Sequence, residues 1–284
     1  MIDFIVTGAT GFIGNRLLNE LKLSGLQVIG LGSKDGDVAS IETWKNLPSA
    51  RVVIHLAGLS YVPESWDNSS EFMKTNIIGT EHALMYCRKH GARFVMASAY
   101  LYGVPQNMPI TEKDVVRPNN PYALSKYLAE QLAGFSYQYH QFPVTVLRIF
   151  NVFGLGQRED FLIPTIIGQA VKKRAIRLQD LNPRRDYVYV DDVVDAFILA
   201  SQLEEGYNLM NIGSGKSHSV AEVVQIVQMI LGTNFPVVSE KRVRPQEIPE
   251  VIADIELAEK ILGWTPKIAL EEGLRKMIRG YEYD

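Results

Sequence analysis

Cysteine is nearly absent from this chain of 284 residues: Cys87 is the single one, so no intrachain disulfide can form. This scarcity fits a reducing compartment, and we expect a cytoplasmic location. An excess of basic charge is absent as well, because 29 Lys and Arg residues face 32 Asp and Glu residues and the formal net charge is −3. With no Lys/Arg run either, nucleic acid is not an expected partner.

Long hydrophobic runs are missing too. No uncharged stretch is long enough to span a bilayer, so we expect no membrane partner. Residues 1–6 are apolar, but they carry no basic region and lead straight into a glycine-rich loop, which is not the pattern of a signal peptide. A hydrophobic content of 46% and a charged content of 21% are ordinary for a globular protein with one large or two modest domains. We see no repeat and expect no metal site.

A glycine loop near the N-terminus is the first motif present. It lies between a short apolar strand at residues 2–6 and a helical pattern at residues 16–23, which is the context of a dinucleotide-binding loop. Gly8 permits the tight turn, Gly11 lets the backbone approach a pyrophosphate, and Gly14 allows close helix packing. The alternative is a plain turn before a surface helix. The expected cofactor contacts here are Gly8, Thr10, Gly11, Phe12, Ile13 and Gly14.

The end of the second strand, residues 27–31, bears on the choice between NAD and NADP. An acidic residue there would bind the ribose hydroxyls, whereas a basic residue would accommodate a 2′-phosphate. This chain has no acid at the tip; it has Ser33 and Lys34, which favour NADP(H) over NAD(H). The alternative is that Lys34 is a solvated loop lysine with no role in cofactor binding. Asp37 follows and is a candidate contact for the adenine edge.

The third strand, residues 51–58, ends in small residues that let a cofactor lie across the sheet, so Leu56, Ala57 and Gly58 are expected contacts. We interpret His55 in the same strand as a packed, hydrogen-bonded histidine. Asn76 begins a long helix that runs to about residue 90, and it faces the sheet either as a cofactor contact or as a packed polar residue. Further strands at residues 93–97 and 144–149 alternate with helices, which predicts an α/β, Rossmann-type, doubly wound parallel sheet.

The second half of the chain has a looser pattern. Helices are expected at residues 161–173, 220–231, 255–262 and 270–281, and a strand followed by a helix at residues 184–203. We expect residues 1–155, with the returning segment of about 183–203, to form the cofactor-binding domain. Residues of about 156–182 and 204–284 would then form a smaller, interleaved substrate domain.

Tyr122 and Lys126 are four residues apart in a stretch of good helix formers that begins with Pro121. One helical turn brings both side chains to one face. The lysine cation is expected to lower the pKa of the tyrosine, which then exchanges a proton with a hydroxyl or carbonyl as hydride moves. Such spacing is common on helix surfaces, so the spacing alone does not identify a catalytic pair. The other motifs of the chain support that interpretation.

Taken together, the ordered motifs resemble an extended short-chain dehydrogenase/reductase of the NAD-dependent epimerase/dehydratase family, over nearly the whole chain. They are residues 7–14, 55–57, 76–80, 98–103, 122–126, 148–154, 185–192, 211–215 and 262–266. The resemblance implies that Ser98, Tyr122 and Lys126 are the catalytic residues and that Lys126 also holds the cofactor. It further implies nucleotide-sugar contacts from Asn151, Arg185 and Arg244, and a homodimer. Surface ion pairing is the alternative for each arginine.

Departures from the family pattern narrow the reaction. Members that dehydrate sugars carry an Asp-Glu pair after the catalytic Ser/Thr, where this chain has Ala99 and Tyr100. Members that epimerise at C3 and C5 need a Cys/His pair, and Cys87 is not in a matching place. The shared chemistry that the resemblance implies is hydride transfer at C4 of a nucleotide-linked hexose. Reduction of an NDP-4-keto-6-deoxy sugar is favoured, with an NDP-sugar 4-epimerase holding NAD tightly as the alternative, and a non-catalytic NADP sensor as a third possibility.

Overall fold

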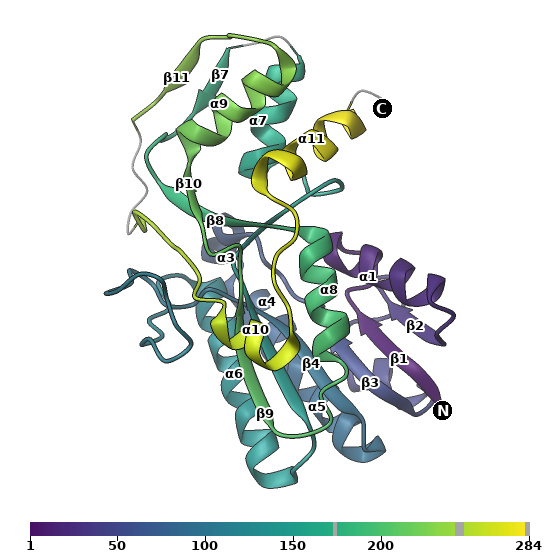
Figure 1. Cartoon of the computed structure of the whole chain (residues 1–284). Coiled ribbons are helices and arrows are strands. Elements are labelled where there is room, and N and C mark those ends of the chain that lie inside the picture. Colours follow the sequence, from purple (N-terminus) through teal and green to yellow (C-terminus); the bar gives the residue numbers. More distant parts are fainter. Residues whose placement is uncertain (173–174, 242–246, 282–284) are drawn as a thin grey trace.

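The computed structural model describes residues 1–172, 175–241 and 247–281, and it forms a large lower unit and a smaller upper one (Figure 1). The lower unit is built on a six-stranded parallel sheet, as the alternating pattern predicts, with the strand order β2-β1-β3-β4-β5-β9. Its strands are β1 (Ile2–Thr7), β2 (Val28–Leu31), β3 (Ala50–His55), β4 (Arg93–Ala99), β5 (Val144–Ile149) and β9 (Tyr207–Ile212).

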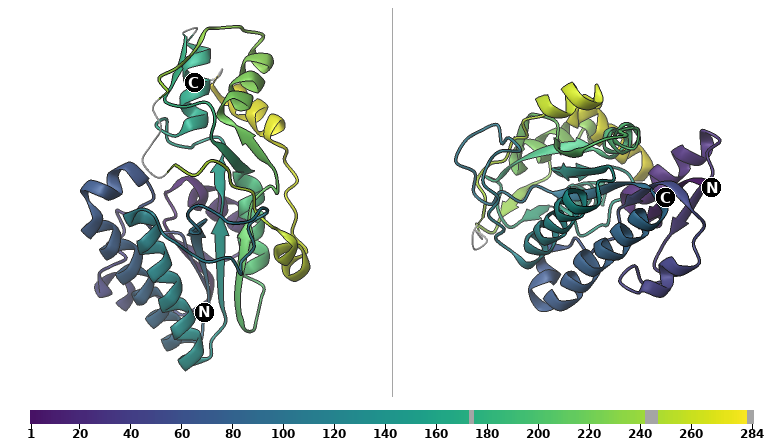
Figure 2. Two further views of the ribbon diagram at one scale, coloured as in Figure 1. Left: turned by 90° about the vertical axis from the view of Figure 1, so that its left-hand side faces the viewer. Right: turned by 90° about the horizontal axis from the view of Figure 1, so that it is seen from below.

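Helices cover both faces of this sheet, and the left view of Figure 2 shows the strands between them. One face packs against α1 (Phe12–Leu23), α8 (Val190–Ala200) and α10 (Glu256–Leu262). The other packs against α2 (Ile41–Lys45), α5 (Gly79–His90) and α6 (Pro121–His140). Short helices α3 (Val62–Asp67) and α4 (Ser69–Met73) and a π-helical turn, η1 (Lys74–Ile78), lead into α5. The sheet is therefore buried on both sides, which explains its apolar strands.

The upper unit has its own apolar core between three helices and two small sheets. The helices are α7 (Leu162–Val171), α9 (Val220–Leu231) and α11 (Leu270–Tyr281). One sheet has the order β10-β8-β6 and the other pairs β11 with β7. Their strands are β6 (Asn151–Phe153), β7 (Ile176–Leu178), β8 (Arg184–Tyr189), β10 (Ser217–Ser219) and β11 (Val237–Ser239).

The boundary drawn from the sequence differs from the structure at two strands. Residues 207–212, expected in the substrate domain, form β9 and pair in parallel with β5 in the large sheet. Residues 184–189, expected to return to the cofactor domain, form β8 and pair instead with β6 and β10. The helix that follows, α8, does pack on the large sheet. Both strands are six residues long and mix polar with apolar side chains, so the local pattern does not show which sheet each one joins.

The last part of the chain ties the two units together through one buried aspartate. The Asp192 carboxylate accepts hydrogen bonds from the backbone N–H groups of Lys267 and Ile268, each at 3.0 Å. The indole of Trp264 donates to the Asp192 carbonyl at 2.8 Å. This segment therefore runs from α10 on the large sheet to α11 in the upper unit.

Within the described residues, no helix combines the length and the apolar character needed to cross a bilayer.

Candidate active site

The glycine loop joins β1 to α1 with very little space between backbone segments. Gly8 has a φ of +67°, a left-handed conformation that favours glycine. A Cβ placed on Gly14 would lie 2.1 Å from the Gly8 carbonyl oxygen, so no larger residue fits there. Thr10, Gly11 and Phe12 line an open groove at the N-terminus of α1. A backbone held this close, at a helix N-terminus, fits a pyrophosphate.

The turn after β2 packs closely against the glycine loop. Asp35 accepts a hydrogen bond from the Gly32 N–H at 2.8 Å, so this acid is used inside the turn. A Cβ on Gly32 would lie 2.5 Å from the methyl group of Thr10 and 2.7 Å from its hydroxyl oxygen. Thr10 therefore fills the space that a side chain at the strand tip would need. Ser33 and Lys34 are exposed, and Lys34 forms no ion pair with any residue that the structure describes.

Asp37, a predicted adenine contact, forms an exposed ion pair within the chain. Its carboxylate pairs with Lys74 at 2.8 Å and accepts a hydrogen bond from the Ala39 N–H at 2.9 Å. The hydrogen bond from Lys74 is the main cause that lowers the pKa of Asp37.

The end of β3 is held by Thr7 at the end of β1. The Thr7 hydroxyl accepts the Ala57 N–H at 3.1 Å and lies 2.9 Å from Nδ1 of His55. His55 is fully buried, and burial followed by the Lys126 cation lowers its pKa to about 3, so the ring is neutral. It is a packed, hydrogen-bonded histidine, as the sequence predicts. Leu56, Ala57 and Gly58 follow at the strand end.

Asn76 links this loop to the helix that carries Tyr122. It lies in the π-helical turn η1, a rare geometry that occurs often at functional sites. Its amide accepts the Leu59 N–H at 2.9 Å and donates to the Ser125 hydroxyl at 2.8 Å. A Cβ on Gly58 would lie 2.8 Å from the Asn76 amide oxygen and 3.9 Å from the Lys126 ammonium, so these three groups are close neighbours.

Helix α6 begins at Pro121, as predicted, and presents Tyr122 and Lys126 one turn apart. The Asn120 side chain caps it by accepting the Ala123 N–H at 2.8 Å. The ring of Tyr122 packs edge-on against Phe72, with the ring centres 6.4 Å apart. Tyr122 is half-buried, whereas Lys126 is only 6% exposed.

Ser98 lies at the C-terminal end of β4, beside Arg148 of β5 in the register of the sheet. It is 4% exposed, and its hydroxyl has no hydrogen-bond partner among the described residues. Buried hydroxyls nearly always have a partner, so this one is available to a bound oxygen atom.

The expected lowering of the Tyr122 pKa by Lys126 is wrong for the chain itself. Burial, followed by the phenol of Tyr100, raises the pKa of Tyr122. Burial also lowers the pKa of Lys126 to about 8, against the opposing influence of Glu130. Desolvation is the largest cause for each group, because each loses water when α6 packs on the sheet. At neutral pH Tyr122 is therefore a protonated phenol.

A buried polar network fixes α6 to the sheet one turn beyond Lys126. Arg148 donates to Glu130 through Nε at 3.0 Å and Nη2 at 2.6 Å, and this pair is only 5% and 1% exposed. Arg148 also donates to the Tyr102 hydroxyl at 2.9 Å, which donates in turn to Asn211 of β9 at 2.6 Å. Every member of the network has a partner, as a buried network requires.

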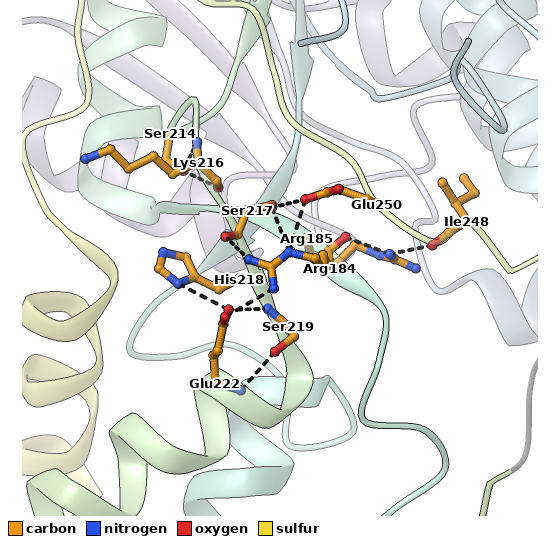
Figure 3. A network of polar contacts seen from close by, with 10 residues as sticks. All are labelled: Arg184, Arg185, Ser214, Lys216, Ser217, His218, Ser219, Glu222, Ile248 and Glu250. Carbon is orange, nitrogen blue, oxygen red and sulfur yellow. Dashed lines mark hydrogen bonds and ion pairs between the residues drawn. The ribbon is translucent and has the colours of Figure 1, made fainter. Parts of the chain in front are cut away.

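The predicted substrate contacts lie along β6 and β8, and the structure shows Arg185 engaged within the chain. Arg185 donates to the carbonyls of Arg184 and Ile248 at 2.8 and 2.7 Å and pairs with Glu247. Figure 3 shows it reaching away from the neighbouring cluster around Arg184, towards Ile248. Asn151 donates to the Asp186 carbonyl at 3.3 Å. Arg244, the third predicted contact, lies outside the described residues.

Three residues of this region were given no role from the sequence. Thr7 organises the ends of β1 and β3, and Ser125 joins Asn76 to α6. Tyr187 is buried beside Asn151, and its hydroxyl has no hydrogen-bond partner in the described parts of the chain. Ser125 directly precedes Lys126 in the motif, so its position in the motif was a usable signal. The other two depend on which strands become neighbours, which is not a local property.

Comparison with known proteins agrees with this architecture. A GDP-6-deoxy-D-talose 4-dehydrogenase of Aggregatibacter actinomycetemcomitans is 31% identical over 92% of this chain and 92% of its own length. A UDP-glucose 4-epimerase of Halalkalibacterium halodurans is 30% identical over 93% of this chain and 90% of its own. The structure of the UDP-glucose 4-epimerase of Thermotoga maritima with UDP-glucose superposes with a TM-score of 0.92, at 27% identity and 99% coverage of both chains. Other solved structures of this fold hold NAD or NADPH.

The family-level match covers both the glycine loop and the helix of Tyr122. The model of the NAD dependent epimerase/dehydratase family matches residues 4–213, well over half of the sequence. The resemblance that the ordered motifs predict is thereby confirmed, and the chain belongs to the NAD dependent epimerase/dehydratase family.

Proposed function

We propose that this chain is an enzyme that reduces the 4-ketone of a nucleotide-linked 4-keto-6-deoxy hexose with NADPH. The observation that carries the proposal is the turn after β2, where Thr10 occupies the space beside Gly32 and Lys34 has no ion pair with any described residue. Gly32 leaves the strand tip without a carboxylate for the ribose hydroxyls, and the exposed Lys34 offers a cation for a 2′-phosphate. A cofactor of that kind is consumed at each turnover, which suits a reductase.

The residues present fit a dinucleotide. Gly8, Gly11 and Gly14 would hold its pyrophosphate at the N-terminus of α1, and Lys34 would meet the 2′-phosphate. Lys126 and Asn76 lie near the end of β3, where the nicotinamide ribose of this fold is expected. When bound, the cofactor supplies the hydride.

The remaining chemistry belongs to the chain. Ser98, whose buried hydroxyl has no partner among the described residues, would donate a hydrogen bond to the ketone oxygen. Tyr122 would then give its proton to the same oxygen as the alcohol forms. Its raised pKa keeps it protonated at neutral pH, which is the form that reduction requires. Lys126 would hold a ribose hydroxyl and stabilise the phenolate that remains.

A 4-epimerase is the second candidate, and two of the comparisons favour it. Two of the proteins described above are UDP-glucose 4-epimerases, and one was solved with UDP-glucose. The same three residues would serve both directions of hydride transfer. The 4-dehydrogenase and the structure with NADPH favour the reductase in the same way. A dehydratase remains disfavoured, because Ala99 and Tyr100 stand where the dehydrating members carry an Asp-Glu pair.

The test is nicotinamide absorbance with the purified chain, NADPH or NADH, and UDP-, dTDP-, GDP- and CDP-linked 4-keto-6-deoxy sugars. We expect stoichiometric loss of NADPH with one nucleotide class. A flat trace throughout, together with interconversion of UDP-hexoses without added cofactor, would identify the epimerase instead. Binding of NADPH with neither reaction would indicate a sensor.

We also propose a cytoplasmic homodimer. The outer face of α6 exposes apolar and aromatic side chains that a partner copy would cover, namely Leu124, Leu128, Phe135 and Tyr139.

Cys87 is buried and its pKa is raised by burial, so it is an inert core residue.

A further inference from the structure

Five buried polar side-chain atoms have no hydrogen-bond partner among the residues that the structure describes. They belong to His55, Ser98, Gln157, Tyr187 and Thr233. A buried hydroxyl left without a partner destabilises the folded chain, so each such group needs a reason. Ser98 has one under the proposed function. Tyr187 is 5% exposed and has none so far.

Other buried aromatic residues do satisfy their polar atoms. The Tyr102 hydroxyl bonds to both Arg148 and Asn211. The Tyr86 hydroxyl donates to the Pro48 carbonyl, and the Trp264 indole donates to Asp192 at 2.8 Å. Among the buried Tyr and Trp residues that the structure describes, Tyr187 is therefore an exception, and a phenylalanine would fill the same space without an unpaired oxygen.

The strand registers bring Tyr187 to the reaction region. Ser98 of β4 lies opposite Arg148 of β5, and the chain then continues through Phe150 into β6. There Asn151 lies directly opposite Tyr187 of β8. The residues that follow Ser98 and the strand that carries Tyr187 thus flank the same short segment, residues 148–151.

The ring of Tyr187 belongs to the apolar core of the upper unit, and its place opposite Asn151, the first residue of β6, puts it at the end of that core nearest this segment. Its ring packs edge-on against Phe153 at 6.3 Å. The groups that act electrostatically on its hydroxyl are Arg185, two residues away on the same face of β8, and Tyr100. Tyr100 also acts on Tyr122, and its ring packs on Phe150 at 5.6 Å. The phenols of Tyr100, Tyr122 and Tyr187 therefore border one region.

We infer that Tyr187 is a substrate-binding residue whose hydroxyl donates a hydrogen bond to the hexose of the bound nucleotide sugar, an inference that rests on the proposed function. The hexose is favoured over the diphosphate because the hydroxyl borders the same region as Tyr122, the proposed proton donor, and Ser98. The unpaired hydroxyl destabilises the free chain, and the bound ligand provides the partner that it lacks.

The test replaces Tyr187 by phenylalanine in the full chain, with Thr233→Val as the matched control. Thr233 follows α9, far along the chain from β4, β6 and α6, and its hydroxyl is likewise unpartnered. Calorimetric titration of the wild type with UDP-glucose, dTDP-glucose, GDP-mannose and CDP-glucose first selects the nucleotide sugar that binds most tightly. That compound, its free nucleoside diphosphate and NADPH are then titrated into each variant.

We expect Y187F to bind the nucleotide sugar about tenfold more weakly, the equivalent of about 1.4 kcal/mol. Its affinities for the nucleoside diphosphate and for NADPH should be unchanged, and its melting temperature should rise by roughly 2 °C or more. T233V should show the rise in melting temperature alone. Equal binding of the nucleotide sugar by Y187F and the wild type overturns the inference, and so does an equal loss of affinity for the free diphosphate. If none of the nucleotide sugars binds the wild type, the proposed function falls and this inference with it.

Discussion

Lys126 gives up its proton more readily than a free lysine because burial disfavours its charged form and lowers its pKa to about 8. The charged form is the one that holds the ribose and supports the Tyr122 phenolate. Below pH 8 the ammonium is present, and above it the ammonium is lost. We therefore expect kcat/KM for NADPH oxidation to fall as the pH rises through about 8. The measurement is a pH profile between pH 6 and 9.5 in one buffer series, and a flat profile across that range contradicts the assignment.

Tyr122 is expected to matter for the proton and not for binding. Tyr122→Phe removes the proton donor and should lower kcat by about 10²- to 10⁴-fold, the usual contribution of a general acid. The affinity for NADPH, measured by fluorescence titration, should stay the same. Tyr139→Phe is the control, since Tyr139 is 62% exposed on the same helix. A Tyr122→Phe variant with normal turnover would remove Tyr122 from the mechanism.

At the scale of elements, the Arg148–Glu130 pair anchors α6 to β5. Arg148→Met leaves the Glu130 carboxylate buried without its partner, which should lower the free energy of unfolding by about 3–5 kcal/mol. Arg275→Met is the control, because it breaks a pair with Glu271 in which both side chains are 47% exposed. That change should cost less than about 1 kcal/mol. Urea denaturation of both variants at pH 7 makes the comparison, and equal losses would mean that the buried pair does not anchor the helix.

The turn between β2 and α2 is the element that should choose the cofactor. Lys34→Ala should weaken NADPH binding roughly fivefold, or about 1 kcal/mol, by removing the cation proposed to meet the 2′-phosphate. NADH binding should not change, because NADH has no phosphate there. Lys22→Ala, at an exposed position of α1, controls for a general loss of positive charge. Similar losses for NADPH and NADH would show that the turn does not discriminate between them.

For the whole molecule, the exposed apolar face of α6 predicts self-association. Sedimentation should give twice the chain mass of 31.9 kDa. Leu128→Glu, at a position 39% exposed in the single chain, should shift the population to monomer by placing a charge in the interface. Leu23→Glu on α1 should leave the assembly intact, since Leu23 is 81% exposed on a different helix. A wild type that sediments only as monomer removes the dimer.

Local patterns in the sequence predicted the elements well and their partners less well. The glycine loop, the start of α6 at Pro121 and the exact span of α11 follow from turn chemistry and helical periodicity, which are local properties. The exchange of β8 and β9 was missed because strand pairing depends on distant segments. The Arg185–Glu247 contact and the raised pKa of Tyr122 were missed for the same reason, since each is produced by packing between residues far apart in sequence.

Strand β9 has a consequence for how the chain is made. It completes the large sheet beside β5, yet it is synthesised only after β6, α7, β7, β8 and α8. Between the end of β5 and the end of β9 lie 63 residues. At about 5–20 residues per second, a ribosome leaves the apolar edge of β5 unpaired for roughly 3–13 s. An exposed strand edge recruits other chains, so truncation before residue 207 or stalled translation in this interval is expected to send the nascent chain into aggregates.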